Sequence, residues 1–232
     1  MREDLFPFPI LYQSSHFVII NKPAGIPCSS REQHRPSVEH YLPALSRRKD
    51  GPWLVHRLDQ ETSGCLLIAL RKDPLIKAQA CFSDHTALKK YWAIVVGHPP
   101  TATGIISTPL RKQSSPLGWK VVIDHHHGKP AKTEWRLLGQ NTHHSWLELT
   151  LYSGRTHQIR VHCQHLGCPV LGDPLYGKPS SSPLVEKSLK GSVKMHLHAV
   201  SLDLFLTPPL RAIAPPPPHM EKQLKACGWQ ST

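Results

Sequence analysis

The strongest constraint on the fold is the run HRLDQETSG at positions 56–64, which leads directly into the apolar stretch CLLIAL at 65–70. An uninterrupted apolar stretch of this length predicts a buried strand, and the small residues before it predict a turn. Asp59 then lies at the rim of a sheet, where catalytic side chains are commonly placed. Taken alone, an aspartate beside Thr, Ser and Gly is more often a turn residue that bonds its own backbone. The run therefore predicts a sheet strand and leaves both interpretations of Asp59 open.

Three further stretches accompany this run in a fixed order. They are NKPAG at 21–25, KKYWAIVVG at 89–97, and GRTHQIRVH at 154–162 followed by LGDPLYG at 171–177. Together with HRLDQETSG they resemble the RluA-like family of RNA pseudouridine synthases, in which HRLD-x-x-TSG carries the catalytic aspartate. The likeness runs from about residue 10 to about residue 206. Four separated motifs in the same order are far more specific than any one of them.

The resemblance implies an α+β fold, with a long, bent, mostly antiparallel mixed sheet that is flanked by helices and loops around a basic cleft. We expect residues 1–210 to form a single catalytic domain and residues 211–232 to form a proline-rich C-terminal tail. A chain of 232 residues suits one such core. Because only about ten residues precede the first predicted strand, we expect a short form without the N-terminal S4 RNA-binding domain of many relatives.

Hydrophobic periodicity divides the chain into strands and helices. Strands are predicted over 10–12, 16–20, 65–70, 88–96, 132–138, 145–151 and 195–206. Helices are predicted over 36–45 with Ser37 as cap, over 73–82 with Asp73 as N-cap, over 156–166 with Thr156 as cap and Gly167 as stop, and over 220–226. The resemblance places a hairpin with a basic insertion within 99–118, and residues 179–183 have the composition of a turn.

The resemblance also assigns three catalytic residues. Asp59 is expected to attack or stabilise ribose C1′ of the target uridine. Arg155 is expected to hold Asp59 through a bidentate pair that keeps the carboxylate ionised despite burial. Tyr91 is expected to stack on the flipped base and to take the C5 proton. Taken alone, Arg155 is an ordinary arginine at a helix start and Tyr91 an ordinary strand tyrosine. The implied chemistry requires no cofactor and no metal.

Five more residues are expected to bind the substrate. A uridine inside folded RNA must be extruded to react, at a cost of a few kcal/mol. Arg57 resembles the side chain that fills the vacated stack, and Ile159 and Leu171 are expected to form apolar walls of the pocket. His56 belongs to the same motif as Arg57. Lys22 is expected near the cleft, although a solvated loop lysine is the simpler interpretation.

The charge of the chain favours an RNA partner. Lys and Arg number 28 against 16 Asp and Glu, which gives a formal net charge of +12 without any single basic block. Such a distributed field attracts polyanions, although excess basic residues also serve solubility alone. We therefore expect tRNA or rRNA as the partner, no membrane, and a monomer. The 17 histidines lead us to expect stronger RNA binding as the pH falls from about 7 to about 6.

The cysteines and the N-terminus favour the cytoplasm. None of the six cysteines forms a close C-x-x-C pair, and the chain begins with charged residues and prolines in place of an apolar leader segment. This pattern is typical of reduced thiols in a cytosolic protein. No apolar run reaches the length that crosses a membrane.

Two other classes of function remain as alternatives. A non-catalytic RNA-binding protein or chaperone that keeps the fold is one, and the intact Asp59, Tyr91 and Arg155 argue against it. A metal-dependent hydrolase is the other, because His162 and His165 share a face of the predicted helix, as two zinc ligands would. The neighbouring Cys163 is turned about 100° from His162 on that helix, so we treat the metal site as the minority interpretation.

Overall fold

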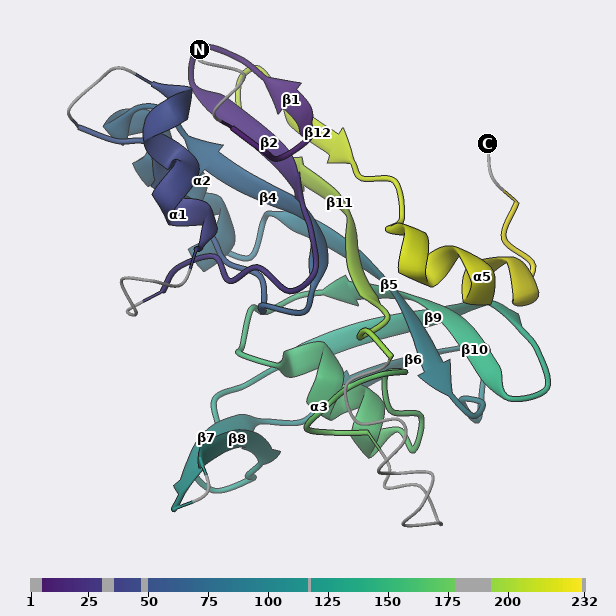
Figure 1. Cartoon of the computed structure of the whole chain (residues 1–232). Coiled ribbons are helices and arrows are strands. Elements are labelled where there is room, and N and C mark those ends of the chain that lie inside the picture. Colours follow the sequence, from purple (N-terminus) through teal and green to yellow (C-terminus); the bar gives the residue numbers. More distant parts are fainter. Residues whose placement is uncertain (1–5, 31–35, 47–49, 117, 178–192, 231–232) are drawn as a thin grey trace. The chain divides into compact units, whose positions relative to one another are not determined.

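The computed structural model describes residues 6–30, 36–46, 50–116, 118–177 and 193–230. The turn predicted over 179–183 lies outside the described residues. The chain divides into two compact units, which can be followed by colour in Figure 1. Unit 1 is Met1–Lys89 with His198–Pro217, and unit 2 is Lys90–Leu197 with Pro218–Thr232. The expectation of a single catalytic domain over residues 1–210 is not tested by this division and stays a prediction.

The sheet of unit 1 is built around a strand whose residues are all buried, β4 (Ser63–Ala69). Strands β1 (Ile10–Gln13), β2 (Phe17–Lys22) and β4 pair antiparallel, whereas β11 (Leu197–Leu204) pairs parallel to β4. Two short strands, β3 (Trp53–Leu54) and β12 (Leu210–Ile213), pair with β4 and β11. The apolar stretch that follows HRLDQETSG is therefore the buried strand that its composition predicts.

The helices of unit 1 are α1 (Val38–Tyr41), the 3-10 helix η2 (Leu42–Leu45) and α2 (Lys72–Ser83). Ser37 is the N-cap of α1, as predicted. The predicted continuous helix changes to a 3-10 helix at Leu42, next to Pro43, which has no N–H to donate. The prediction of Asp73 as the N-cap of α2 is wrong, because the cap is Arg71 and Asp73 lies in the first turn. A carboxylate is also favourable there, since it faces the positive end of the helix dipole.

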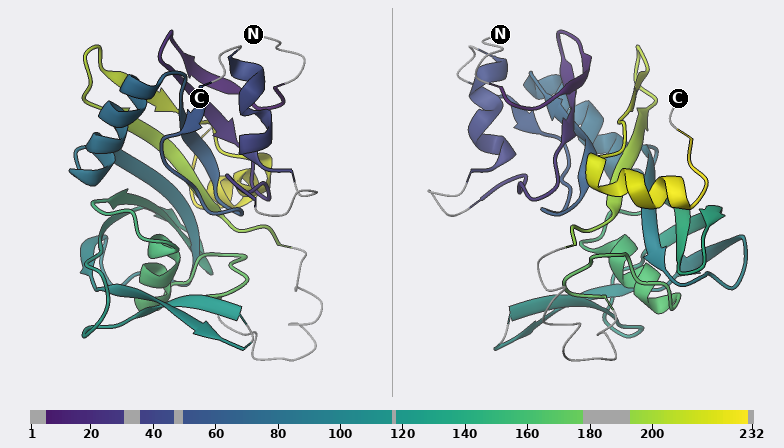
Figure 2. Two further views of the ribbon diagram at one scale, coloured as in Figure 1. Left: turned by 90° about the vertical axis from the view of Figure 1, so that its left-hand side faces the viewer. Right: turned by 45° about the vertical axis from the view of Figure 1, so that its right-hand side comes forward.

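Unit 2 holds a second antiparallel run of strands in the order β5–β10–β9–β6. Their bounds are β5 (Leu88–Val96), β10 (His144–Leu151), β9 (Lys132–Gln140) and β6 (Thr103–Ser107). The hairpin of β7 (Leu110–Ser115) and β8 (Gly118–Ile123) forms a separate two-stranded sheet, and Figure 2 shows it passing beside α3 (Gln158–His165). Separate helices on mixed strands make this an α+β fold, as predicted.

Helix α3 begins two residues later than predicted. Thr156 is not its cap, because the helix starts at Gln158 after His157, whose φ of 53° is left-handed. The side-chain oxygen of Gln158 accepts the N–H of Arg155 at 3.0 Å and the hydroxyl of Ser153 at 2.8 Å. The side chain of Gln158 therefore stabilises the start of the helix, the role that the sequence pattern predicted for Thr156. Gly167 lies just beyond the end of the helix with φ 80°, as its predicted stop role requires.

The C-terminal segment contains more structure than a proline-rich tail. Strand β12 was not predicted; two prolines precede it, and its four residues alternate between buried and exposed. Helix α5 (Pro218–Ala226) covers the predicted helix and extends it by two residues. Met220 and Leu224 are buried against Ile94 and Trp146. Among the described residues, no helix is long and apolar enough to cross a membrane.

Gly64 is predicted to be essential for the stability of unit 1. Its φ of 110° strains any L side chain, and a Cβ there would overlap the backbone of Ala199 on β11. Gly64→Ala should lower the free energy of unfolding by about 2–4 kcal/mol in urea titration. Gly97→Ala has a similar φ of 84° and open space around it, so it should lose only about 1–2 kcal/mol. Equal losses in the two variants would refute the contact with Ala199.

Candidate active site

Asp59 lies in the loop that leads into β4, and backbone hydrogen bonds fix this loop on both sides of it. The N–H of Thr62 donates to the carbonyl of Asp59 at 3.1 Å, which closes a turn. The N–H of Gly25 donates to the carbonyl of Gln60 at 2.9 Å, which joins NKPAG to HRLDQETSG. The two motifs that lie far apart in the sequence are therefore one structural element around Asp59.

Lys22 ties the same two motifs together from inside the protein. Its ammonium donates to the carbonyls of Pro23 and Ile26, both at 2.8 Å, and to that of Gln60 at 3.1 Å. An ammonium has three N–H donors, and three carbonyls receive them. The residue is 0% exposed, and burial lowers the pKa of Lys22 to about 8 against the opposing charges of Cys28, Glu61 and Asp59. Lys22 thus lies beside the loop of Asp59, with no side-chain surface left for a substrate.

Two further side chains hold the residues before Asp59. The thiol of Cys28 donates to the carbonyl of Leu58 and accepts its N–H, both at 3.3 Å. His56 Nε2 accepts the N–H of Leu67 on β4 at 3.1 Å, and the imidazole stacks on Phe82 with ring centres 4.7 Å apart. Burial lowers the pKa of His56 to about 3, so the ring stays neutral and can accept this bond. The sequence-predicted substrate residue His56 is thereby fixed to the sheet.

Arg57 and Ser63 differ in exposure although they belong to the same motif. Arg57 is exposed between His56 and the buried Leu58, which leaves its guanidinium accessible as its expected role requires. Ser63 is 1% exposed, and its hydroxyl lies 2.9 Å from Nδ1 of His198 on β11. The backbone geometry of HRLDQETSG therefore presents Arg57 outward and buries the start of β4.

Four predicted site residues belong to unit 2. Tyr91 on β5 is 8% exposed, Ile159 in the first turn of α3 is 4% exposed, and Leu171 packs against the cluster that contains Ile94. Arg155 donates from Nε to the carbonyl of Pro130 at 3.0 Å. Because Asp59 lies in unit 1 and Arg155 in unit 2, their expected ion pair stays a prediction.

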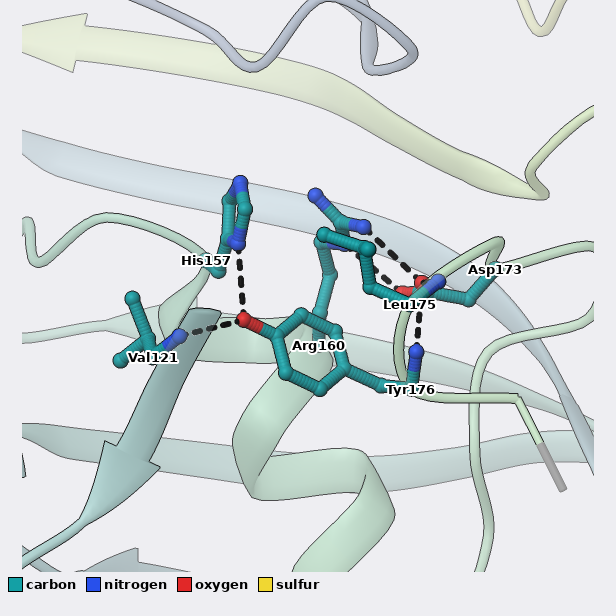
Figure 3. A network of polar contacts seen from close by, with 6 residues as sticks. All are labelled: Val121, His157, Arg160, Asp173, Leu175 and Tyr176. Atoms are coloured by element: carbon teal, nitrogen blue, oxygen red, sulfur yellow. Dashed lines mark hydrogen bonds and ion pairs between the residues drawn. The ribbon is translucent and has the colours of Figure 1, made fainter. Parts of the chain in front are cut away.

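A buried ion pair that sequence reasoning missed joins GRTHQIRVH to LGDPLYG (Figure 3). Arg160 donates from Nε and Nη2 to the two carboxylate oxygens of Asp173 at 2.7 and 2.9 Å, and both side chains are buried. Oδ1 of Asp173 also accepts the N–H groups of Leu175 and Tyr176 at 2.8 and 3.0 Å. The Asp173-Pro174 dipeptide is a sequence signal for the turn, whereas the sequence does not show that Arg160 faces it.

Tyr176 extends this network to the β7–β8 hairpin. Its hydroxyl oxygen accepts the N–H of Val121 at 2.8 Å and lies 2.8 Å from Nδ1 of His157. Its ring also lies 5.0 Å from the guanidinium carbon of Arg160. The hairpin, the start of α3 and the LGDPLYG turn are therefore held together by one set of buried polar contacts (Figure 3).

One of the two histidines considered as metal ligands, His162, has other partners. Nδ1 of His162 lies 2.8 Å from the hydroxyl of Thr133, and Nε2 lies 3.3 Å from the carbonyl of Thr108. Within the described ranges, no group of three His, Cys, Asp or Glu side chains is arranged to hold a metal ion. Burial lowers the pKa of five histidines, which therefore contribute less positive charge on acidification than free imidazoles would: His56, His144, His162, His196 and His219.

Replacing Lys22 should loosen the loop of Asp59. Lys22→Met leaves three buried carbonyls without their donor, so we expect the free energy of unfolding to fall by about 2–4 kcal/mol. Lys77→Met, on the exposed face of α2, is the matched control and should change stability by less than about 0.5 kcal/mol. Urea titration followed by circular dichroism measures both. Equal stability of Lys22→Met and wild type would show that the three bonds contribute nothing.

His56 should make the protein sensitive to acid. Its pKa falls from 6.5 to about 3 on folding, so between these values the unfolded chain binds a proton that the folded chain does not. The free energy of unfolding therefore falls as the pH drops through this window. His56→Gln keeps an acceptor for the N–H of Leu67 but does not titrate, so its stability should fall less steeply. Parallel pH profiles for the variant and wild type would contradict this.

The comparisons with known proteins agree on one family. Residues 16–165 match the family described as RNA pseudouridylate synthase. The chain is 38% identical over 211 residues to an uncharacterized RNA pseudouridine synthase of Zymomonas mobilis, covering 90% of this chain and 93% of that protein. It is 32% identical over 219 residues to ribosomal large subunit pseudouridine synthase C of Vibrio cholerae, covering 93% of this chain and 68% of that protein.

A solved structure also points to this family. Human RNA pseudouridylate synthase domain containing 4 superposes with a TM-score of 0.80 at 28% identity, covering 97% of this chain and 94% of that chain. The sequence resemblance, the fold and the match over residues 16–165 are thus consistent with one another. The chain therefore belongs to the RNA pseudouridylate synthase family and is an isomerase that acts on uridine in RNA.

Proposed function

We propose that this protein converts specific uridines of rRNA or tRNA to pseudouridine, with Asp59 as the catalytic carboxylate. The observation that carries the proposal is the set of polar side chains that fix the loop of Asp59, namely Lys22 and Cys28, which donate to its carbonyls, and His56, which accepts the N–H of Leu67. A loop that only turned the chain would not need three buried polar side chains to fix it. The relative from Vibrio cholerae is named for the large ribosomal subunit, which makes rRNA the first substrate to test.

The reaction breaks the bond between uracil N1 and ribose C1′, turns the base while it remains bound, and joins C5 to C1′. Asp59 would attack or stabilise C1′ after the first bond breaks and would leave when C5 rejoins. Water must be excluded during this interval, because its attack on C1′ would turn isomerisation into hydrolysis. A fixed backbone at Asp59 supports the positioning that such chemistry needs.

We propose that the remaining site residues bind the uridine and its surroundings, each in the role that its exposure and its bonds allow. Tyr91, buried on β5, would stack on the base and take the C5 proton. Arg155 uses its Nε–H on Pro130, and a guanidinium carries four further N–H donors for a pair with Asp59. The exposed Arg57 would fill the vacated base stack. Ile159 and Leu171 would line the pocket.

Lys22 and His56 act in this proposal as positioning residues. Their polar atoms bond Gln60 and Leu67. They would therefore affect the substrate indirectly, by positioning the loop that carries Asp59. The non-catalytic RNA-binding alternative assigns no purpose to a carboxylate in this loop. The two proposals therefore differ in what removal of the Asp59 charge does.

The test compares wild type, Asp59→Asn and Glu61→Gln on bulk rRNA and tRNA from a strain that lacks this gene. Asn keeps the size of Asp59 but removes the carboxylate, so pseudouridine formation should fall by about 10³-fold or more while RNA binding persists. Glu61→Gln removes a neighbouring carboxylate and should keep activity within about threefold of wild type. Mapping the new pseudouridines by sequencing also identifies the target position.

Each outcome of this test decides between the alternatives. Wild-type activity in Asp59→Asn would exclude Asp59 as the catalytic group. RNA binding by wild type without any pseudouridine would replace the isomerase proposal with the binding-protein alternative. Equal losses in Asp59→Asn and Glu61→Gln would point to a general effect of charge on RNA binding.

A further inference from the structure

Trp119 is an exposed aromatic residue on the β7–β8 hairpin, and it has no role in the proposed chemistry. It lies on β8 and is 42% exposed. The strand register places it on the same face as Val121, which is buried against Val161 and Tyr176. The apolar face of the hairpin therefore continues beyond its core and ends in an exposed indole.

The indole is held in place by a partly buried network. Its ring stacks on the imidazole of His157, with ring centres 5.0 Å apart and planes at 22°. His157 is in turn hydrogen-bonded to Tyr176, whose hydroxyl oxygen also accepts the N–H of Val121 (Figure 3). Trp119 is thus oriented before any partner arrives, which reduces the entropy lost when a partner binds.

The charge around Trp119 suits an anionic partner. The ammonium of Lys112 lies 4.1 Å from the centre of the indole ring. Both Lys112 and Lys120 are exposed, and within the described part of the chain neither makes an ion pair with a carboxylate. Arg111, by contrast, is paired with Asp124 at 2.6 Å. Among the described residues, the hairpin therefore presents the Lys112 ammonium beside the indole without a carboxylate partner, and Lys120 adds a second positive charge on the same strand as the indole.

We propose that Trp119 is a stacking platform for an unpaired base of the RNA substrate, outside the target uridine, and that Lys112 binds a flanking phosphate. The proposal rests on the proposed function, because it takes RNA as the ligand. Stacking of a base on an aromatic side chain is stronger than a cation–π contact at an exposed site. An incoming base therefore displaces the Lys112 ammonium, which then reaches the negative charge next to that base.

Tyr152 offers a matched control in the same unit. It is 41% exposed, and the ammonium of Lys132 lies 4.8 Å from its ring centre. Its hydroxyl donates to Glu134 at 2.6 Å, so a carboxylate lies next to the ring. A negative charge at that position repels a phosphate. An exposed aromatic ring with a lysine is thus present in both places, but only Trp119 has surroundings that favour RNA.

The experiment measures binding of short oligouridylate and of a fully paired RNA duplex by fluorescence anisotropy. Trp119→Leu keeps apolar bulk but removes the flat ring, so the affinity for oligouridylate should fall about tenfold with duplex binding unchanged. Trp119→Phe should retain most of the affinity, and Tyr152→Leu all of it. Lys112→Gln should lower the slope of log affinity against log salt by about 0.7 on oligouridylate. Circular dichroism verifies that each variant is folded.

Failure of this inference can be told from failure of the proposed function. If wild type forms pseudouridine while Trp119→Leu binds oligouridylate as wild type does, the platform is refuted and the isomerase stands. If wild type forms no pseudouridine but Trp119→Leu loses affinity for oligouridylate, the platform stands without the isomerase. Equal losses in Trp119→Leu and Tyr152→Leu refute the platform, because they reflect a general property of exposed aromatic residues. If the Trp119→Leu variant is not folded, Trp119→Met replaces it with the same expected tenfold loss of affinity for oligouridylate, and wild-type affinity in Trp119→Met refutes the platform.

Discussion

The buried ammonium of Lys22 is the interaction on which the site of unit 1 depends. It occupies a position where a lone charge is costly, and it persists because three carbonyls surround it. One of these carbonyls belongs to Gln60, the residue after Asp59. Cys28 fixes Leu58, the residue before Asp59, through two bonds. The backbone on either side of the proposed catalytic carboxylate is therefore set by residues from another part of the sequence.

Unit 2 also fixes its backbone through a buried charged side chain, in this case by an ion pair. The Arg160–Asp173 pair is buried and bidentate, and Asp173 also caps two backbone N–H groups of its own turn. A buried ion pair that lacked some of its hydrogen bonds would destabilise the fold. A pair whose hydrogen bonds are all made favours one arrangement of the surrounding chain. Through Tyr176 this pair reaches the hairpin that carries Trp119. In both units, polar side chains of the family motifs hold the surrounding backbone in place.

Much of the fold follows from sequence pattern, but the side-chain contacts of the motifs do not. The uninterrupted apolar run at 65–70 and the alternation over 88–96 predict β4 and β5 because burial dictates composition. Thr156 was expected to cap α3, yet Gln158 closes that turn through its side chain, a contact that no local propensity encodes. Lys22 was expected at the substrate, because a sequence does not show that the nearby carbonyls of Pro23 and Ile26 and the distant one of Gln60 converge on its ammonium.

The most direct measurement is hydrogen exchange of backbone amides in wild type and Lys22→Met. The N–H of Gly25 bonds the carbonyl of Gln60, and that of Thr62 bonds the carbonyl of Asp59. If Lys22 holds this loop, both amides exchange faster in the variant, while the amides of α3 in unit 2 keep their wild-type rates. Unchanged exchange at Gly25 and Thr62 would show that the loop of Asp59 is fixed without Lys22, which contradicts the central role given to its buried charge.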